Sequence, residues 1–353
     1  LGIRLRGKID SGMLQAIHHA GVKPLFVTVE YNGPGDPVLE LSQALDSFED
    51  AFRPVATARL AEIGRTVPTQ GWAKISEQDK AKVIAAVPAN PPAKPRKTRK
   101  VLVVDLSIGH PHHPSVPFAN FALQQWGTKT QAFTPVFSND PENLKYPRIG
   151  EYDTVFLNNT VGQVFLDPQV RTSLIRFVRE GGGLVGFHGV AAASLDWSEF
   201  SDMTGARLES RGARPLLRPY PDIKNDQQKA ALKVEVPGHP LTEHLGGKPI
   251  EWLEEYYTFE KPTFSRDRVR VLLSIDFPRT DMSQCSTCSR DDDVPVAWIR
   301  NFGKGRVFYT VMGHWPYLFE TPEMARFMFA GLQFALGDLE ADASPQTADA
   351  ATR

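Results

Sequence analysis

The hydrophobic pattern changes character near residue 100. From there on, short apolar runs alternate with longer stretches whose apolar side chains recur at helical spacing. The first run, residues 100–106, is almost continuously apolar, which is typical of a central strand in a parallel sheet. A helix is predicted to open at Asp167 and Pro168 and to stop at the glycines that begin with Gly181. The same pattern predicts further helices over 118–126 and 322–336, and further strands over 133–138, 154–159, 184–187, 231–236, 252–259, 268–275, 294–301 and 306–312.

The order of these elements predicts an α/β fold. Strands and helices that alternate along the chain form right-handed βαβ units, which build a parallel sheet with helices on both faces. The strands predicted between residues 231 and 275 form a β-rich insertion between the early and the late strands. In such a sheet, ligands bind beyond the carboxyl ends of the strands, because the loops there converge over one crevice.

The N-terminal part of the chain does not continue this pattern. Residues 1–56 hold one predicted strand and one predicted helix, which are too few to bury a core. Residues 57–96 are a helical stretch that leads into a proline-rich linker, where proline removes backbone donors and disfavours helix. We therefore expect the main domain over 97–338, followed by a disordered polar tail over 339–353.

Composition and charge narrow the class of protein. The 353 residues are 41% hydrophobic and 23% charged, as in ordinary globular proteins. Forty Lys and Arg nearly balance 41 Asp and Glu, so neither a nucleic acid nor an anionic membrane is expected as a partner. No apolar run approaches the roughly 20 residues that a membrane span needs. No targeting segment is recognisable, and cytoplasmic and periplasmic locations both stay open.

The two cysteines, Cys285 and Cys288, form a lone C-x-x-C pair in a polar loop. Such a pair can be redox-active, form half of a zinc site or close a local disulfide. The sequence has no second cysteine pair to complete a four-thiolate site. We therefore interpret this loop as incidental or locally cross-linked, with metal or redox function as the weaker alternative.

Histidines follow three of the predicted strands. His110, His112 and His113 come after the first strand, His188 after the strand over 184–187, and His314 after the last strand. Because strand ends of a parallel sheet meet at one edge, these imidazoles are expected to converge. An imidazole there can act as a general base or a metal ligand. The alternative for each is a structural histidine bonded to a backbone carbonyl, or a solvated loop residue.

Imidazoles and a carboxylate from separate elements suit a zinc-like divalent site with an open position. The expected carboxylate is Glu255, which we also expect to act with His188 and His314 in catalysis. The candidate metal ligands are His112, His113, His188 and His314.

Aromatic and polar side chains near these positions are candidates for binding a sugar. Aromatic faces commonly stack on sugar rings, although plain packing is the alternative for each aromatic residue. The substrate-binding candidates are His112, His113, Asn159, Tyr257 and Trp315.

The segment GFHG, which contains His188, has the shape of a nucleophile elbow, where a tight turn lifts one side chain above the sheet edge. Several motifs in order, VLVVDLSIGHPHHPSVP, YDTVFLNNTVG, FVREGGGLVGFHG, PGHPLTEHL, EEYYTF and PVAWIRNFGKGRVFYTVMGH, resemble the ThuA-like (trehalose utilisation) family over residues 97–338. The resemblance implies a flavodoxin-like, class I glutamine amidotransferase-like fold. It implies that His188 stands at the amidotransferase cysteine position and His314 at the histidine position. Glutaminase chemistry is thereby excluded, because no thiol stands at the elbow.

Residues 7–48 resemble the last βα unit of a sugar isomerase/epimerase TIM barrel, with Glu30 where such barrels often place a metal ligand. A fusion of this kind points towards carbohydrate chemistry, and the ThuA-like resemblance implies a sugar isomerase/epimerase or a dehydrogenase as partner. The alternative is a helical extension that packs on the main domain.

Taken together, the resemblances imply sugar catabolism, with a small-molecule carbohydrate as ligand. The expected substrate is a 3-keto disaccharide or glycoside, and the reaction is hydrolysis, elimination or isomerisation. One rival is a non-catalytic sugar-binding protein with a decayed amidotransferase-type site. Another is a scaffold that docks the isomerase barrel. Association of the chain with copies of itself also stays open.

Overall fold

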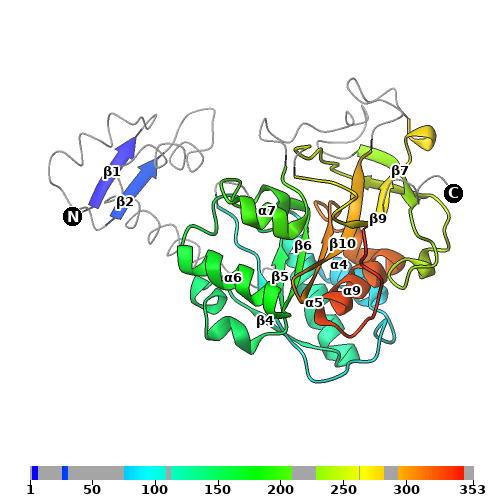
Figure 1. The fold of residues 1–353 in the computed structure, drawn as a ribbon, viewed down its shortest axis with the longest axis horizontal. Helices are drawn as coiled ribbons and strands as arrows, with labels where there is room; N and C mark the ends of the chain where they lie inside the picture. Colours follow the sequence, from blue (N-terminus) through cyan, green and yellow to red (C-terminus); the bar gives the residue numbers. More distant parts are fainter. Residues whose placement is uncertain are drawn as a thin grey trace.

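A computed structural model describes residues 2–6, 26–30, 75–108, 113–208, 228–261, 263–281 and 293–345 (Figure 1). Strand β1 (Gly2–Arg6), which the pattern did not predict, pairs in parallel with β2 (Phe26–Glu30), the described part of the strand expected there. The rest of the predicted barrel unit lies outside the described residues, as do His110, His112, Cys285 and Cys288.

Five parallel strands form one half of the main sheet. Along the sheet they run in the order β4, β3, β5, β6 and β11. This order, 2-1-3-4-5 in the chain order of the five, is the flavodoxin-like arrangement, so the predicted fold class is confirmed. Their bounds are β3 (Lys100–Val104), β4 (Thr134–Phe137), β5 (Thr154–Asn158), β6 (Gly183–Phe187) and β11 (Gly305–Thr310).

Antiparallel strands extend the same sheet beyond β11. β10 joins β11 through a turn that contains Gly303 at a φ of 62°, and so short a connection can only link antiparallel strands. The strand that was predicted over 252–259 ends at Glu254 in the structure, so Glu255 and Tyr257 lie in the loop after it. The four strands, in order from β11, are β10 (Pro295–Phe302), β9 (Arg270–Ile275), β7 (Gln228–Val234) and β8 (Ile250–Glu254).

Helices cover both faces of the parallel half (Figure 1). Phe308 on β11 points to one face and contacts Phe327 of α9, whereas its neighbour Tyr309 points to the other and stacks on Trp298. One layer contains α4 (Glu77–Ala86), α5 (Val116–Thr130), α8 (Tyr317–Glu320) and α9 (Pro322–Leu336). The other layer contains α6 (Pro168–Glu180) and α7 (Ser198–Thr204).

The segment before β3 packs on this body. α4 lies against α5, α8 and α9, and the backbone of Ala93 exchanges two hydrogen bonds with the Gln333 side chain. The boundary expected at residue 97 stays a prediction. Residues 339–345, for which disorder was expected, follow a defined path in which Ala343 is buried.

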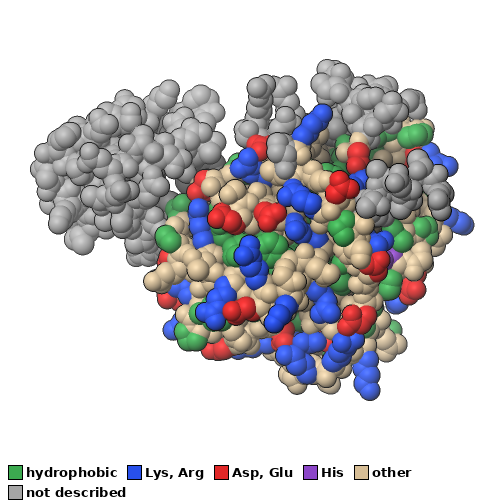
Figure 2. Space-filling model, viewed as in Figure 1, with side chains coloured by type: hydrophobic (Ala, Val, Ile, Leu, Met, Phe, Trp, Pro, Cys, Tyr) green, Lys and Arg blue, Asp and Glu red, His purple; other side chains and the backbone are tan. Residues whose placement is uncertain are grey.

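The described surface agrees with the balanced charge of the sequence. Figure 2 shows acidic and basic side chains interspersed over the visible face. Among the described helices, none has both the length and the apolar character needed to cross a membrane.

Candidate active site

His188 begins the turn that follows β6. Its φ of 47° lies in the left-handed region, which is unusual for a residue other than glycine. The next residue is Gly189, where an added Cβ would lie 3.2 Å from Cε1 of His113. The tight turn expected from the GFHG segment is therefore present, and it carries an imidazole.

The His188 ring is fully buried and held in one orientation. Its Nδ1 lies 2.8 Å from the carbonyl oxygen of Val311, and because a carbonyl can only accept, this nitrogen must carry the proton. In the neutral ring, Nε2 then keeps a lone pair. Nε2 lies 2.6 Å from the Tyr257 hydroxyl, 3.0 Å from Nδ1 of His314 and 3.2 Å from Oε2 of Glu255.

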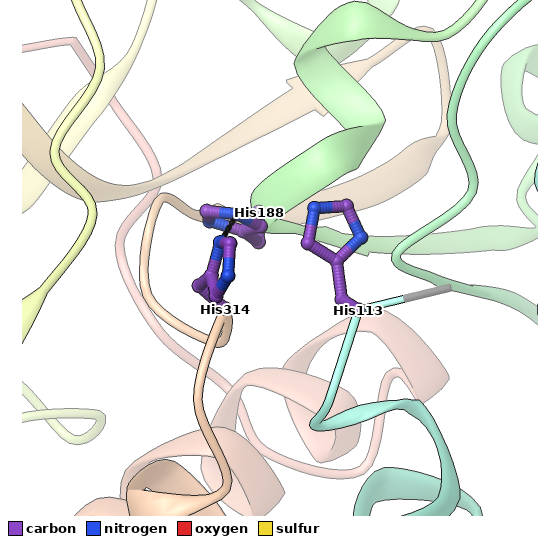
Figure 3. Close-up of side chains that lie close together, drawn as sticks. All are labelled: His113, His188 and His314. Carbon is purple, nitrogen blue, oxygen red and sulfur yellow. Dashed lines mark hydrogen bonds between the residues drawn. The ribbon is translucent and has the colours of Figure 1, made fainter. Parts of the chain in front are cut away.

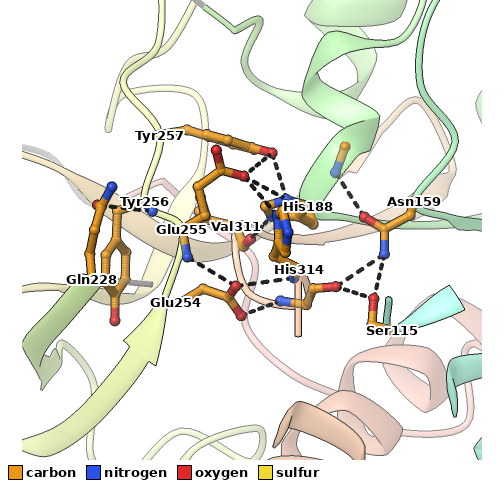
Figure 4. A network of polar contacts seen from close by, with 12 residues as sticks. Ser115, Asn159, His188, Gln228, Glu254, Glu255, Tyr256, Tyr257, Val311 and His314 are labelled. Carbon is orange, nitrogen blue, oxygen red and sulfur yellow. Dashed lines mark hydrogen bonds and ion pairs between the residues drawn. The ribbon is translucent and has the colours of Figure 1, made fainter. Parts of the chain in front are cut away.

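These four side chains, His188, Glu255, Tyr257 and His314, are called the polar centre below (Figure 4). Oε2 of Glu255 also lies 2.9 Å from Nδ1 of His314 and accepts a hydrogen bond from the Tyr257 hydroxyl at 3.2 Å. The Tyr257 ring stacks on His188, with the ring centroids 4.6 Å apart. The centre thus joins the ends of β6 and β11 to the loop after β8.

Burial and hydrogen bonding oppose each other at Glu255. Burial raises the pKa of its carboxyl, but the interactions with the imidazoles of His188 and His314 outweigh burial and leave the pKa below its ordinary value. At Tyr257, burial raises the pKa of the phenol and the nearby Glu255 charge adds to this. Glu255 is therefore a carboxylate at neutral pH, and Tyr257 keeps its proton.

Glu254 supports the centre from behind, a role that the sequence did not predict. Its side chain is buried and accepts the backbone N–H groups of Gly313 at 2.6 Å, His314 at 3.1 Å and Glu255 at 3.0 Å. Burial raises its pKa, while the nearby His188 opposes that shift. One carboxylate therefore fixes the backbone of two members of the centre. Side chains alternate across a strand, so the EE pair itself signalled that the two carboxylates differ in environment.

Asn159 links loops rather than reaching into the centre. Its Nδ2 donates to Oγ of Ser115 at 2.9 Å and to the carbonyl of Gly313 at 3.0 Å. Its Oδ1 accepts the N–H of Gly189 at 3.2 Å, and Ser115 also donates to the Gly313 carbonyl. Substrate binding by Asn159 stays a prediction, and Ser115 was not anticipated.

His113 is the described member of the predicted histidine cluster, and it lies beside the polar centre (Figure 3). Its ring meets the rings of His188 and His314 edge-on, with centroids 4.8 Å and 4.9 Å away. One nitrogen from each of the three rings lies within 4.8 Å of the other two. Trp315 places its ring 4.9 Å from that of His314. Imidazoles can act as general acids or bases, and their nitrogens are donor atoms typical of a divalent metal site.

Comparison with known proteins gives a family and a fold. The sequence model of the ThuA family, described as trehalose utilisation, matches residues 100–335, which is more than half of the chain. A solved ThuA-like protein of Bacteroides uniformis is 19% identical, with a TM-score of 0.51, over 68% of this chain and 91% of its own. A ThuA-like protein of Parabacteroides merdae is 17% identical, with a TM-score of 0.48, over 72% of this chain and 98% of its own. Among curated proteins, the search finds no match.

The family match spans β3 to α9, the same segment that carries the motifs quoted from the sequence. At 19% identity the likeness to the Bacteroides uniformis structure bears on the fold alone, and it agrees with the flavodoxin-like sheet. The description of the family places the protein in carbohydrate utilisation. The chain therefore belongs to the ThuA, or trehalose utilisation, family.

Proposed function

We propose that this protein is an enzyme of carbohydrate utilisation and that the polar centre is its reaction centre. The proposed substrate is a sugar with a carbonyl group, such as a 3-keto disaccharide or glycoside. The reaction class is hydrolysis, elimination or isomerisation. The observation that carries the proposal is the meeting of a carboxylate, a phenol and two imidazoles from three separate segments within hydrogen-bond distance.

The exposure of these side chains indicates which of them meet the sugar. Glu255 and His314 keep 12% and 14% of their side chains exposed, whereas His188 has none. Glu255 and His314 can therefore touch a ligand, whereas the buried His188 contacts both of them and fixes their positions. Tyr257, also buried, adds a proton donor within reach of both Glu255 and His188.

These groups match the chemistry of a keto sugar. A carbonyl acidifies the carbon next to it, so removal of that proton needs a positioned base and a donor to the oxygen. Glu255, a carboxylate, and the imidazole of His314 are the bases at the exposed edge, and Tyr257 is the neutral donor. Proton removal next to the carbonyl is the common first step of elimination and isomerisation.

The test is turnover of trehalose, 3-keto-trehalose and 3-keto-glucosides by the full chain, followed by NMR. Glu255→Gln keeps the shape of the side chain and removes its charge, and we expect it to abolish turnover. The matched control is His244→Ala, which removes a remote imidazole that is bonded to the carbonyl of Glu323. Melting temperatures of all variants check folding.

Turnover that persists in both Glu255→Gln and His314→Ala would rule out this reaction centre. Saturable binding of the sugars without any turnover by the wild-type protein would instead identify a sugar-binding protein.

A further inference from the structure

Three ligand-type atoms of the polar centre form a small triangle. Nε2 of His188 and Nδ1 of His314 are 3.0 Å apart, and Oε2 of Glu255 lies 3.2 Å from the first and 2.9 Å from the second. Nitrogen and oxygen ligands about 2.0–2.1 Å from a tetrahedral zinc ion stand about 3.3–3.4 Å from one another. The triangle therefore needs to widen by only a few tenths of an ångström to hold such an ion.

The orientation of His188 is the one that metal binding requires. A histidine that binds a metal through one nitrogen almost always donates its other N–H to a carbonyl or carboxylate, which fixes the tautomer. Nδ1 of His188 donates to the Val311 carbonyl in this way, and Nε2 points into the triangle. The ring is fully buried, so its position is set before any ligand arrives.

The charge of the centre also suits a cation. Two carboxyl groups, Glu254 and Glu255, lie beside two imidazoles, and these are the side chains that bind divalent cations in proteins. Glu254 fixes the backbone of both Glu255 and His314, so it acts as a positioning residue behind two of the three triangle atoms. Outer partners of this kind tune the affinity of a site for its metal.

His113 adjoins the triangle and is the candidate for a fourth ligand. Its ring lies edge-on to both His188 and His314, and its nitrogen lies within 4.8 Å of one nitrogen of each (Figure 3). A structural zinc site has four protein ligands, whereas a catalytic site has three and an open position. With the His113 ring moved onto the ion, the site would have four protein ligands and be closed. With the ring in its present position, the site would have three protein ligands and an open position.

We propose that His188, His314 and Glu255 bind one divalent cation of the zinc type, with His113 as the adjoining ligand. The role of this ion in turnover rests on the proposed function, whereas its binding does not. An ion held there supplies a Lewis acid that can polarise a sugar carbonyl. Glu255 is the carboxylate that the sequence analysis expected at such a site, and His112, also predicted there, lies outside the described residues.

The experiment measures binding directly on the full chain. Cys285 and Cys288 are first replaced by serine, because thiolates bind zinc and would add a second class of site. The protein is stripped with a chelator and titrated with ZnCl₂ by calorimetry. It is also titrated with CoCl₂, whose visible absorption reports coordination geometry. We expect one equivalent per chain and an intense absorption typical of a four-coordinate ion.

Variants assign the ligands. Glu255→Gln and His314→Ala should each abolish binding of one equivalent, whereas His244→Ala should bind as the parent does. Glu254→Gln should weaken binding by about 10- to 100-fold, the range for a partner behind the ligands. Circular dichroism of the metal-free proteins confirms that each variant is folded.

The absence of saturable binding by the parent protein, or unchanged binding in both Glu255→Gln and His314→Ala, would overturn the assignment. Turnover by the metal-free protein would overturn the role of the ion in turnover and leave the proposed function standing. A bound ion with no turnover on any keto sugar would refute the proposed function and leave the metal-binding assignment standing.

Discussion

Asp105 is a buried carboxyl whose ionisation should be visible in the pH dependence of stability. It follows β3 directly, is 2% exposed, and accepts hydrogen bonds from Nδ2 of Asn120 at 2.7 Å and of Asn139 at 2.6 Å. Burial is the largest influence on its pKa, and although these hydrogen bonds oppose it, the pKa rises from 3.8 to about 6. The folded protein therefore binds this proton more tightly than the unfolded chain does.

The perturbation is Asp105→Asn, which removes the titrating group and nearly keeps its shape. The contribution of a raised pKa is fully present below the unfolded value of 3.8 and is lost as the pH rises through about 6. Two pH units correspond to about 3 kcal/mol in the free energy of unfolding, at about 1.4 kcal/mol per unit. Because pH 4 already lies slightly above the unfolded value of 3.8, the wild-type value minus the variant value should fall by about 2.4 kcal/mol between pH 4 and pH 7.

The assay is urea unfolding followed by circular dichroism at pH 4, 5, 6 and 7 for both proteins. Subtraction of the variant cancels groups that titrate in both, such as His239, whose pKa is lowered by burial. The constant offset that comes from exchanging a carboxyl for an amide does not affect the slope. A difference that stays flat over this range would refute the argument from burial.

Three further substitutions test the supports of the polar centre, each by urea unfolding. Gly313→Ala should cost about 2–4 kcal/mol, because φ is 118° and the new Cβ would lie 2.4 Å from Cδ2 of Phe187; a neutral effect would show that the loop can shift. Tyr309→Phe should cost about 1–2 kcal/mol, because the hydroxyl donates to the buried His188 carbonyl at 2.7 Å; an unchanged free energy would mean that this carbonyl finds another donor. Asn159→Ala should cost about 2–4 kcal/mol through its lost hydrogen bonds and should lower turnover as well; full turnover would contradict its role in holding the loops.

The sequence predicted the parallel half of the sheet well. The strand expected over 184–187 is β6 (Gly183–Phe187), and the helix expected over 322–336 is α9 with the same bounds. Hydrophobic periodicity is a local property of the chain, so it can be read without knowing which elements pack together. The motifs likewise led to the ThuA family, which the family match confirms.

Strand partners could not be read in the same way. The pattern predicted a strand over 294–301 without its partners, and β10 (Pro295–Phe302) runs antiparallel to both of its neighbours. Strand β1 was missed, because a run of five residues with alternating arginines carries a weak apolar signal. Pairing depends on backbone hydrogen bonds between distant segments, and local periodicity does not encode these.

The convergence of His188 and His314 was expected because both follow strands of a parallel sheet, and the structure shows β6 and β11 to be neighbours. The sequence by itself determined the elements, their order and the residue types at the strand ends. Only the tertiary structure decided that Glu254 accepts backbone N–H groups while Glu255 faces the imidazoles, and that Asn159 links loops. The physical reason is that periodicity acts over a few residues, whereas desolvation and hydrogen-bond geometry are set by atoms far apart in the chain.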